Sequence, residues 1–171
     1  YMPEYYYDKD NGRKVTKAGF VKDNRGLTYY LDEKGNKVLG LHEINGDLYY
    51  FRRGGAYKYT QLGDMWQDSI NYIDGKIYYF GHDGRAIKNR FYQWGNYWYY
   101  FYADGSAATG AVQINGQQLY FDKNHGRQVK GAFAPDGHYY DENSGELVTN
   151  QTRTIKGVTY HFDENGNATK V

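Results

Sequence analysis

The sequence predicts an all-β fold, a β-solenoid of stacked short β-hairpin repeats of about 20 residues each. Three observations lead to this prediction. Aromatic triplets recur along the 171 residues, turn-forming glycines stand before and after nearly every triplet, and tyrosine replaces the usual aliphatic residues of a core. The whole of residues 1–171 is therefore expected to form a single array of about eight hairpin repeats.

The triplets are the clearest sign of repetition. Their middle residues follow one another at intervals of 19 to 29 residues, and the single longest interval contains an apparent insertion near residues 59–69. The eight triplets are Tyr5–Tyr7, Tyr29–Leu31, Tyr49–Phe51, Tyr78–Phe80, Tyr99–Phe101, Leu119–Phe121, His138–Tyr140 and Tyr160–Phe162. Because the pattern continues to both ends of the sequence, we expect the chain to be a fragment of a larger protein.

Turn signals divide each repeat into a hairpin and a short connector. Asn45–Gly46, Asp74–Gly75 and Asn115–Gly116 precede triplets, and Asp83–Gly84 and Asp104–Gly105 follow them. Asn-Gly and Asp-Gly supply the positive φ angles that tight hairpin turns require. The residues between the turns alternate in polarity, as half-buried strands do. A single hairpin is marginal in water, so the repeats are expected to stack.

Composition excludes several classes of protein. The chain has 22 Tyr, 8 Phe and 3 Trp, no Cys, and 21 basic residues against 20 acidic ones. This near-neutral balance gives no electrostatic footprint for nucleic acid. No apolar run approaches the roughly 18 residues that span a bilayer. Without Cys there is no disulfide, thiolate catalysis or cysteine metal site. We therefore expect no nucleic-acid partner and no membrane insertion.

Strand alternation divides each triplet between two faces. The first and third residues share one face, and the second points to the other. Third residues are mostly Phe, which suits a dry core, whereas seven of the eight second residues are Tyr. We expect the second-residue column to line a half-exposed groove in which ring faces are free to bind.

The connector after the second turn carries polar side chains beside this groove. The residue three past the turn glycine is of core type, as in Val129, so its neighbours two and four past the glycine should face the other way. Gln128 and Lys130 make up the one fully polar pair. An exposed aromatic ring covers the apolar face of a pyranose, and polar side chains pair with its hydroxyl groups. The pattern around residues 120–140 thus favours a sugar site.

These repeats resemble a known family of aromatic cell-wall-binding and glucan-binding repeats. The segments Ile114–Asp122 and Gly126–Gly131 are very similar to repeats of the glucan-binding "domain V" regions of glucansucrases and related glucan-binding proteins of lactic acid bacteria and oral streptococci. The resemblance extends over essentially the whole chain. It implies a secreted, cell-surface-associated binding module of a Gram-positive bacterium, covalently linked to a catalytic or surface domain, with α-glucan such as dextran as its partner.

The resemblance also implies which residues contact the glucan. A stacking Tyr and a Gln-x-Lys motif are the family's contacts, and the motif is matched by Gln128 and Lys130. Tyr120, Tyr139 and Tyr140 are the expected rings of this one good pocket. Weaker pockets are expected elsewhere, since other repeats keep only a Lys, at Lys58 or Lys88. The second-rank candidates for sugar contact are Tyr79, Tyr100, Trp98 and Lys88.

Two other functions remain open at this stage. A structural spacer or protein-binding surface without a sugar site is one of them. A choline- or host-glycan-binding module is the other, although choline-binding repeats usually place a Trp after the glycine that ends a repeat. Here that position holds Phe20, Leu41, Ala111 or Ala132, so a run of choline cages is not expected.

Catalysis is not predicted, and neither is a cofactor or metal. A glycosidase needs a unique pair of carboxylates across a cleft, whereas the acidic residues here follow the triplets and recur with them. Those residues, Asp8, Asp32, Asp122, Asp141 and Asp163, are expected to begin turns. The five His show no ligand spacing. The sequence therefore predicts a non-catalytic binding module.

Overall fold

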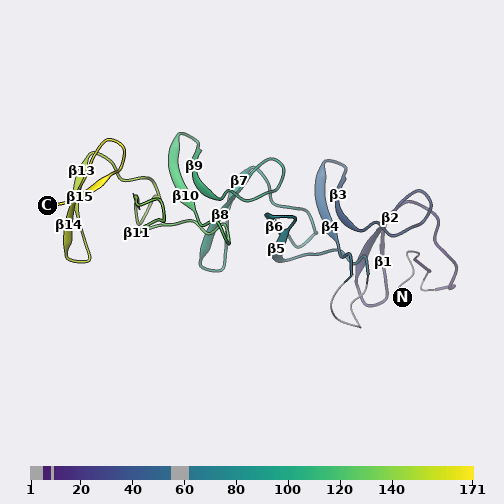
Figure 1. The fold of residues 1–171 in the computed structure, drawn as a ribbon. Helices are drawn as coiled ribbons and strands as arrows, with labels where there is room; N and C mark the ends of the chain where they lie inside the picture. Colours follow the sequence, from purple (N-terminus) through teal and green to yellow (C-terminus); the bar gives the residue numbers. More distant parts are fainter. Residues whose placement is uncertain (1–5, 9, 55–61) are drawn as a thin grey trace. The chain divides into compact units, whose positions relative to one another are not determined.

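The computed structural model describes residues 6–8, 10–54 and 62–171, which form strands and turns and include no helix that could cross a membrane. The all-β prediction is confirmed for these residues (Figure 1). The chain divides into two compact units, Tyr1–Ile87 and Lys88–Val171, and each is considered by itself. The expectation of one continuous array across residues 1–171 stays a prediction.

The described part of the first unit contains three antiparallel hairpins. Each has a strand that begins after a connector, a tight turn, and a second strand that ends on an aromatic triplet. The pairs are β1 (Gly19–Lys22) with β2 (Thr28–Leu31), β3 (Gly40–Ile44) with β4 (Asp47–Phe51), and β5 (Ser69–Ile73) with β6 (Lys76–Phe80).

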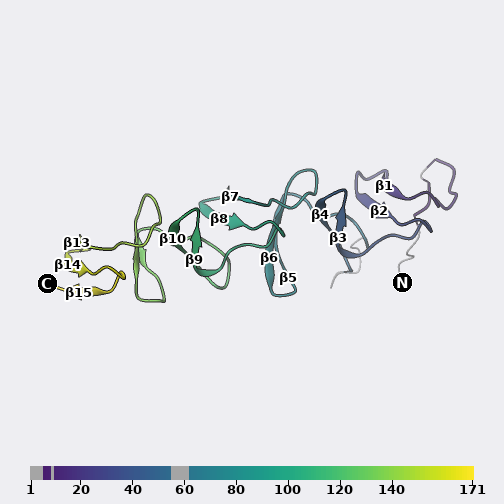
Figure 2. The same ribbon diagram turned by 90° about the horizontal axis from the view of Figure 1, so that it is seen from above.

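The second unit repeats this plan four times and adds a short closing strand. Both ribbon views show the paired strands recurring along the unit (Figures 1 and 2). Its pairs are β7 (Arg90–Trp94) with β8 (Tyr97–Phe101), β9 (Gly110–Ile114) with β10 (Gln117–Phe121), β11 (Ala132–Phe133) with β12 (Tyr139–Tyr140), and β13 (Gln151–Ile155) with β14 (Val158–Phe162), to which β15 (Ala168–Lys170) adds a third strand.

The hairpin turns have the geometry that their sequences predict. Asn45 and Gly46 have φ angles of 53° and 85°, and Asn115 and Gly116 have 52° and 81°. Positive φ at both central residues is the type I′ turn, whose twist matches that of the flanking strands. An L-residue with a Cβ is strained in such a conformation, and Asn tolerates it better than most.

The third residues of the triplets form the core, as predicted, except in the first triplet, where Tyr7 is 50% exposed. Leu31, Phe51, Phe80, Phe101, Phe121 and Phe162 are completely buried. In several repeats the first residue lies beside the third on the same face, with ring centroids 6.3 Å apart for Tyr49 and Phe51 and 5.9 Å apart for Tyr99 and Phe101. Strand alternation therefore correctly predicts that the first and third residues of a triplet share one face.

Backbone hydrogen bonds fasten the connectors to their own hairpins and, in several repeats, to the preceding hairpin as well. The N–H three past the turn glycine donates to the carbonyl of the triplet's second residue, as from Val129 to Tyr120 at 2.8 Å. The N–H two past the glycine donates to the previous repeat, as from Leu147 to Gln118 and from Ala86 to Leu48, both at 2.8 Å. Each unit is therefore a short β-solenoid, held together by backbone bonds as well as by rings.

The predicted outward-facing column of second residues is wrong for most repeats. Tyr50, Tyr79, Tyr120 and Tyr139 are buried. Each unit shows the reason, because the second-residue ring packs on the third-residue ring of the next repeat. The centroids of Tyr120 and Tyr140 are 5.7 Å apart, and those of Tyr139 and Phe162 are 6.1 Å apart. The tyrosine column thus joins neighbouring repeats and does not line an open groove.

The recurrent aspartates begin turns, as predicted. The carboxylates of Asp8, Asp32, Asp122, Asp141 and Asp163 each accept the backbone N–H two residues further on, at 2.8 to 2.9 Å. Amide donors favour the ionised carboxylate, and Arg153 adds a 2.8 Å ion pair at Asp141. The backbone N–H groups of Ser144 and Asn143, followed by Arg153, lower the pKa of Asp141 to about 2.

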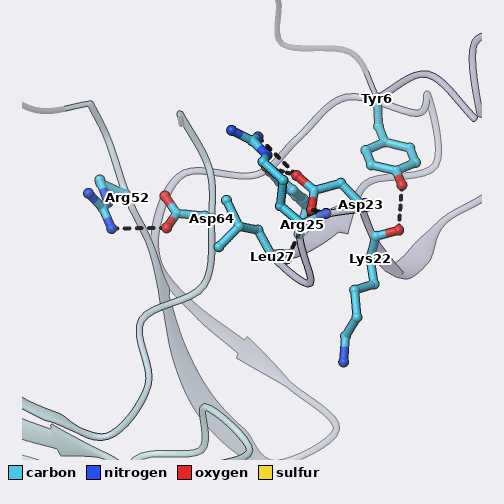
Figure 3. A network of polar contacts seen from close by, with 8 residues as sticks. Tyr6, Lys22, Asp23, Arg25, Leu27, Arg52 and Asp64 are labelled. Atoms are coloured by element: carbon cyan, nitrogen blue, oxygen red, sulfur yellow. Dashed lines mark hydrogen bonds and ion pairs between the residues drawn. The ribbon is translucent and has the colours of Figure 1, made fainter. Parts of the chain in front are cut away.

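The predicted insertion near residues 59–69 lies partly outside the described residues, as do Tyr5 of the first triplet and Lys58. The base of the insertion is described (Figure 3). Arg52 Nη2 contacts Asp64 Oδ2 at 2.9 Å, and Asp64 is buried. Two backbone bonds reinforce the contact, from Arg52 N to Asp64 O at 3.0 Å and from Gly63 N to Arg52 O at 2.8 Å.

Candidate functional site

The connector at residues 126–131 places the Gln-x-Lys motif beside a tryptophan of the preceding hairpin. Gln128 forms a bridge with Phe121, and its backbone N–H donates to the carbonyl of Trp98 at 2.8 Å. Lys130, two residues further on, holds its ammonium 5.5 Å from the centre of the Trp98 ring. Trp98, Gln128 and Lys130 thus come together although 30 residues separate Trp98 from Gln128.

Gly145 makes room for both polar side chains of the motif. A Cβ at this glycine would collide with the amide nitrogen of Gln128 and would lie 3.4 Å from the stem of Lys130. The Lys130 ammonium also donates to the Asn143 carbonyl at 3.4 Å. Gln128 is half-buried and Lys130 is exposed, while 37% of Trp98 is accessible. One flat ring and two polar ends are therefore available to a ligand at this surface.

Three of the expected sugar-contacting rings are not available for stacking. Tyr120, Tyr139 and Tyr140 are buried at 2%, 6% and 2% exposure. The Tyr140 hydroxyl donates to Asp136 Oδ2 at 2.7 Å, and burial together with this bond raises the Tyr140 pKa. These tyrosines support the fold beneath the connector, and the ring that the structure offers to a ligand is Trp98, a second-rank candidate in the sequence.

The remaining candidates occupy different places. Tyr79 is buried in the first unit, where its carbonyl accepts the Ile87 N–H at 2.9 Å. Lys88 is the first residue of the second unit and is half-buried. Tyr100 is half-buried, and its ring meets Phe91 edge-on at 4.8 Å. Tyr100 and Trp98 are two residues apart and therefore lie on the same face of β8, where Tyr100 packs beside the Trp98 surface.

Sequence reasoning did not identify a cluster of three rings that is found among the described residues of both units. In the first unit, the Phe20 ring meets Tyr30 at 4.8 Å and Tyr49 at 5.2 Å, both edge-on. A pocket of about 380 Å³ adjoins Phe20 and Tyr49. Phe20 follows Gly19 directly, at the place where Trp was sought, but Phe133 stands one residue further from Gly131, so the signal was an aromatic residue within two positions of the glycine.

The second unit has the same cluster with nearly the same geometry. Phe133 meets Tyr139 at 5.1 Å and Tyr160 at 5.2 Å, both edge-on, beside a second pocket of about 380 Å³. The equivalence follows from the register, because Phe20 pairs with Tyr30 as Phe133 pairs with Tyr139. The two phenylalanines are 44% and 39% exposed, so each cluster presents one open ring beside a pocket.

Among the described residues, no group of three His, Asp or Glu could hold a metal ion. The arrangement of exposed rings, amides and ammonium groups can bind a ligand, and it contains no paired carboxylates of the kind that glycoside hydrolysis needs. What it can do chemically is to stack on flat apolar surfaces and to donate and accept hydrogen bonds.

Comparison with known protein families identifies the class of these repeats. Residues 108–151 match the model described as a choline-binding repeat, and residues 18–37, 89–107 and 153–168 match the putative cell wall binding repeat. The matched segments are hairpin-and-connector units of the kind described above. The chain is therefore a non-catalytic binding module of the choline-binding and cell-wall-binding type.

Curated relatives identify the branch of this class. Glucosyltransferase-S of Streptococcus mutans is 37% identical over 169 residues, a match that covers 95% of this chain and 11% of the relative. Glucosyltransferase-I of Streptococcus downei is 38% identical over 165 residues, covering 92% of this chain and 10% of the relative. The chain belongs to the family of cell-wall-binding repeats that these streptococcal glucosyltransferases contain, and it spans about a tenth of their length.

Solved structures share the fold. Choline binding protein F from Streptococcus pneumoniae is 28% identical with a TM-score of 0.75, and the match covers 96% of this chain and 54% of that one. The autolysin LytC from the same species, at 21% identity, has a TM-score of 0.72 over 99% of this chain and 37% of its own. These matches show that the chain has the hairpin-repeat fold of streptococcal choline-binding proteins.

Proposed function

We propose that this module recognises α-glucan of the dextran type at the surface formed by Trp98, Gln128 and Lys130. The observation that supports the proposal is the open Trp98 ring with the Lys130 ammonium 5.5 Å from its centre. The apolar face of a glucose ring covers an indole face, while the Lys130 ammonium and the Gln128 amide can hydrogen-bond its hydroxyl groups. The similarity to streptococcal glucosyltransferases supports a glucan as the polymer.

Such a site is weak when it acts alone, because it is shallow and largely open to water. Useful retention on a polymer arises when several sites on linked repeats bind one chain, so that each further contact forms at a high effective concentration. In this proposal the module tethers a covalently attached glucosyltransferase or cell-surface domain to glucan outside the cell. Dextran is then held far more tightly than glucose or isomaltose.

Substitution of the site residues tests this function. In native gels that contain dextran, Trp98→Ala is expected to weaken retardation about fivefold, because one exposed stacking contact contributes roughly 1 kcal/mol. Gln128→Ala/Lys130→Ala is expected to weaken it by a similar factor through lost hydrogen bonds. The matched control is Gln113→Ala/Lys123→Ala, which removes an exposed Gln and Lys from the same unit.

The outcomes of this experiment separate the possible functions. Equal retardation of the wild type and both site variants would place the sugar site elsewhere. A wild type that dextran does not retard at all would contradict glucan binding and favour a structural spacer or protein-binding surface. Equal affinity for glucose, isomaltose and the polymer would contradict the tethering role.

A second candidate function is binding of a quaternary ammonium group at the two three-ring clusters. Phe20 and Phe133 each meet two tyrosines beside a pocket, and aromatic faces attract such cations. The match to a choline-binding repeat also favours it. However, the pocket beside Phe133 is lined by Lys156 and by no acidic residue, so it would repel a cation, and in the pocket beside Phe20 the charge of Lys22 offsets that of Asp83. For this reason a neutral α-glucan is the better-supported ligand.

Retention on a choline-bearing gel tests the second candidate. If the clusters bind quaternary ammonium groups, the wild type is retained and free choline elutes it. Phe133→Ala and Phe20→Ala should each reduce retention, whereas Tyr72→Ala removes an exposed ring outside both clusters and should not. Absence of retention by the wild type, together with retardation by dextran, would exclude choline and leave glucan as the ligand.

A further inference from the structure

The hairpin β7–β8 exposes large aromatic rings on both of its faces. Trp94, Tyr97 and Trp98 are 39%, 44% and 37% exposed, and all three lie at the tip of this one hairpin. Only Trp98 belongs to the sugar site proposed above. Neighbouring exposed rings on a protein surface often mark a binding site.

The register of the hairpin assigns the three rings to opposite faces. Trp94 pairs directly with Tyr97 across the turn at Gly95 and Asn96, and Gln93 pairs with Trp98. Paired residues share a face, and successive residues of a strand alternate. Trp94 and Tyr97 therefore stand side by side on the face opposite to Trp98.

The connector that carries the Gln-x-Lys motif serves both faces of this hairpin. Lys130 lies over the Trp98 ring, whereas the Arg127 guanidinium carbon lies 4.0 Å from the centre of the Tyr97 ring. The backbone of Arg127 is fixed by a 3.1 Å bond from its N–H to Asp122 Oδ2. The buried Nε of Arg127 has no hydrogen-bond partner among the described residues. The second face thus repeats the composition of the first, with aromatic rings and a fixed polar donor.

We propose that Trp94, Tyr97 and Arg127 form a second carbohydrate-binding surface, so that one hairpin holds two segments of glucan on its opposite faces. This inference rests on the proposed function of the Trp98 surface. The rings of Trp94 and Tyr97, paired across the hairpin, offer a platform to a pyranose, and the guanidinium of Arg127 beside Tyr97 can donate hydrogen bonds to its hydroxyls. A module with two such faces cross-links glucan chains as well as anchoring to them.

The charge of the second unit favours a neutral polymer as the occupant. Residues 88–171 contain eight Lys and Arg and eight Asp and Glu, so the unit has no net charge to attract an acidic polymer. The positive charge of Arg127 is itself stacked on Tyr97. A neutral, hydroxyl-rich chain matches this surface better than an anionic glycan does.

The test compares variants of the full chain at the two faces. Trp94→Ala/Tyr97→Ala is expected to weaken retardation by dextran about fivefold and to abolish the turbidity that the wild type produces with high-mass dextran. Trp98→Ala/Trp94→Ala/Tyr97→Ala should lose nearly all retardation. Tyr72→Ala, which removes a ring that is 66% exposed in the first unit, should behave as the wild type.

Tryptophan fluorescence gives a second readout that does not depend on avidity. In a Trp98→Phe/Trp66→Phe variant, Trp94 is the remaining tryptophan, and its emission should change on titration with isomaltooligosaccharide. The proposal would be overturned if this emission did not change and if Trp94→Ala/Tyr97→Ala bound dextran like the wild type. In that case the Trp98 variants would still test the proposed function separately.

Two further outcomes would also overturn the inference. If sedimentation shows that the wild type is a dimer and that Trp94→Ala/Tyr97→Ala is a monomer, the surface is a contact between copies of the chain. If the same variant loses retardation by dextran sulfate but not by dextran, the occupant is an acidic polymer.

Discussion

Replacing Phe121 by alanine is expected to lower the free energy of unfolding of residues 88–171 by about 3–5 kcal/mol. The ring is completely buried, and it packs in a cluster with Ala108, Ile114 and Leu119. Removing it leaves a cavity that neighbouring strands can fill only in part. Because domains are stable by only about 5–15 kcal/mol, this loss would remove a large share of the unit's free energy of unfolding.

Urea denaturation of the full chain in a Trp66→Phe background isolates this effect. Trp94 and Trp98, both in the second unit, are then the only tryptophans, so their emission follows the unit that contains Phe121. Phe121→Leu should lose only about 1 kcal/mol, because Leu fills most of the space. Phe133→Ala, at an exposed ring, should lose less than Phe121→Ala. Equal losses for Phe121→Ala and Phe133→Ala would show that the triplet's third column does not form the core.

The core and the turns could be predicted because they depend on neighbouring residues in the sequence. Alternation within each strand places Phe51, Phe80 and Phe121 on the buried face of their own hairpins, and Asn45–Gly46 is sufficient to specify a tight hairpin. The second-residue tyrosines could not be assigned in the same way. Their environment depends on how one hairpin turns against the next, and that rotation is not encoded in the pattern of any one repeat.

The candidate site was predicted in part for the same reason. Gln128 and Lys130 are neighbours in sequence, so their common face followed from alternation. Their aromatic partner comes from the preceding hairpin through the hydrogen bond from Gln128 N to Trp98 O. The nearest tyrosines in the sequence, Tyr120 and Tyr139, instead fill the interior beneath them. Contacts between repeats, and not the spacing within one repeat, determine which aromatic ring lies beside Gln128 and Lys130.

Removing the guanidinium of Arg52 is expected to destabilise the first unit by about 2–4 kcal/mol at neutral pH, less than for a fully buried pair because Arg52 is partly exposed. Asp64 is only 5% exposed, and Arg52 Nη2 contacts its Oδ2 at 2.9 Å (Figure 3). Its other oxygen, Oδ1, is buried with no hydrogen-bond partner among the described residues. In Arg52→Met the stem remains to pack, but the buried carboxylate loses its cation.

The loss should depend on pH, and its direction follows from the pKa of Asp64. Burial raises this pKa above that of the unfolded chain, and Arg52 opposes the rise. A carboxyl whose pKa is raised by folding contributes its stability below the unfolded pKa and loses it as the pH rises through the folded pKa. Without Arg52 the folded pKa rises further, so Arg52→Met should approach the wild type at acid pH and fall well below it at neutral pH.

Denaturation by urea at pH 4.5 and pH 7.5 measures this difference, with Trp66 as the reporter in a Trp94→Phe/Trp98→Phe background. Adding Asp64→Asn to Arg52→Met should restore much of the stability at pH 7.5, because a neutral amide is far less costly to bury than a carboxylate. The backbone bonds between residue 52 and residues 63 and 64 remain in every variant, so the base of the insertion stays closed. An equal loss at both pH values, with no rescue by Asp64→Asn, would mean that Arg52 stabilises the unit through packing of its stem and not through its charge.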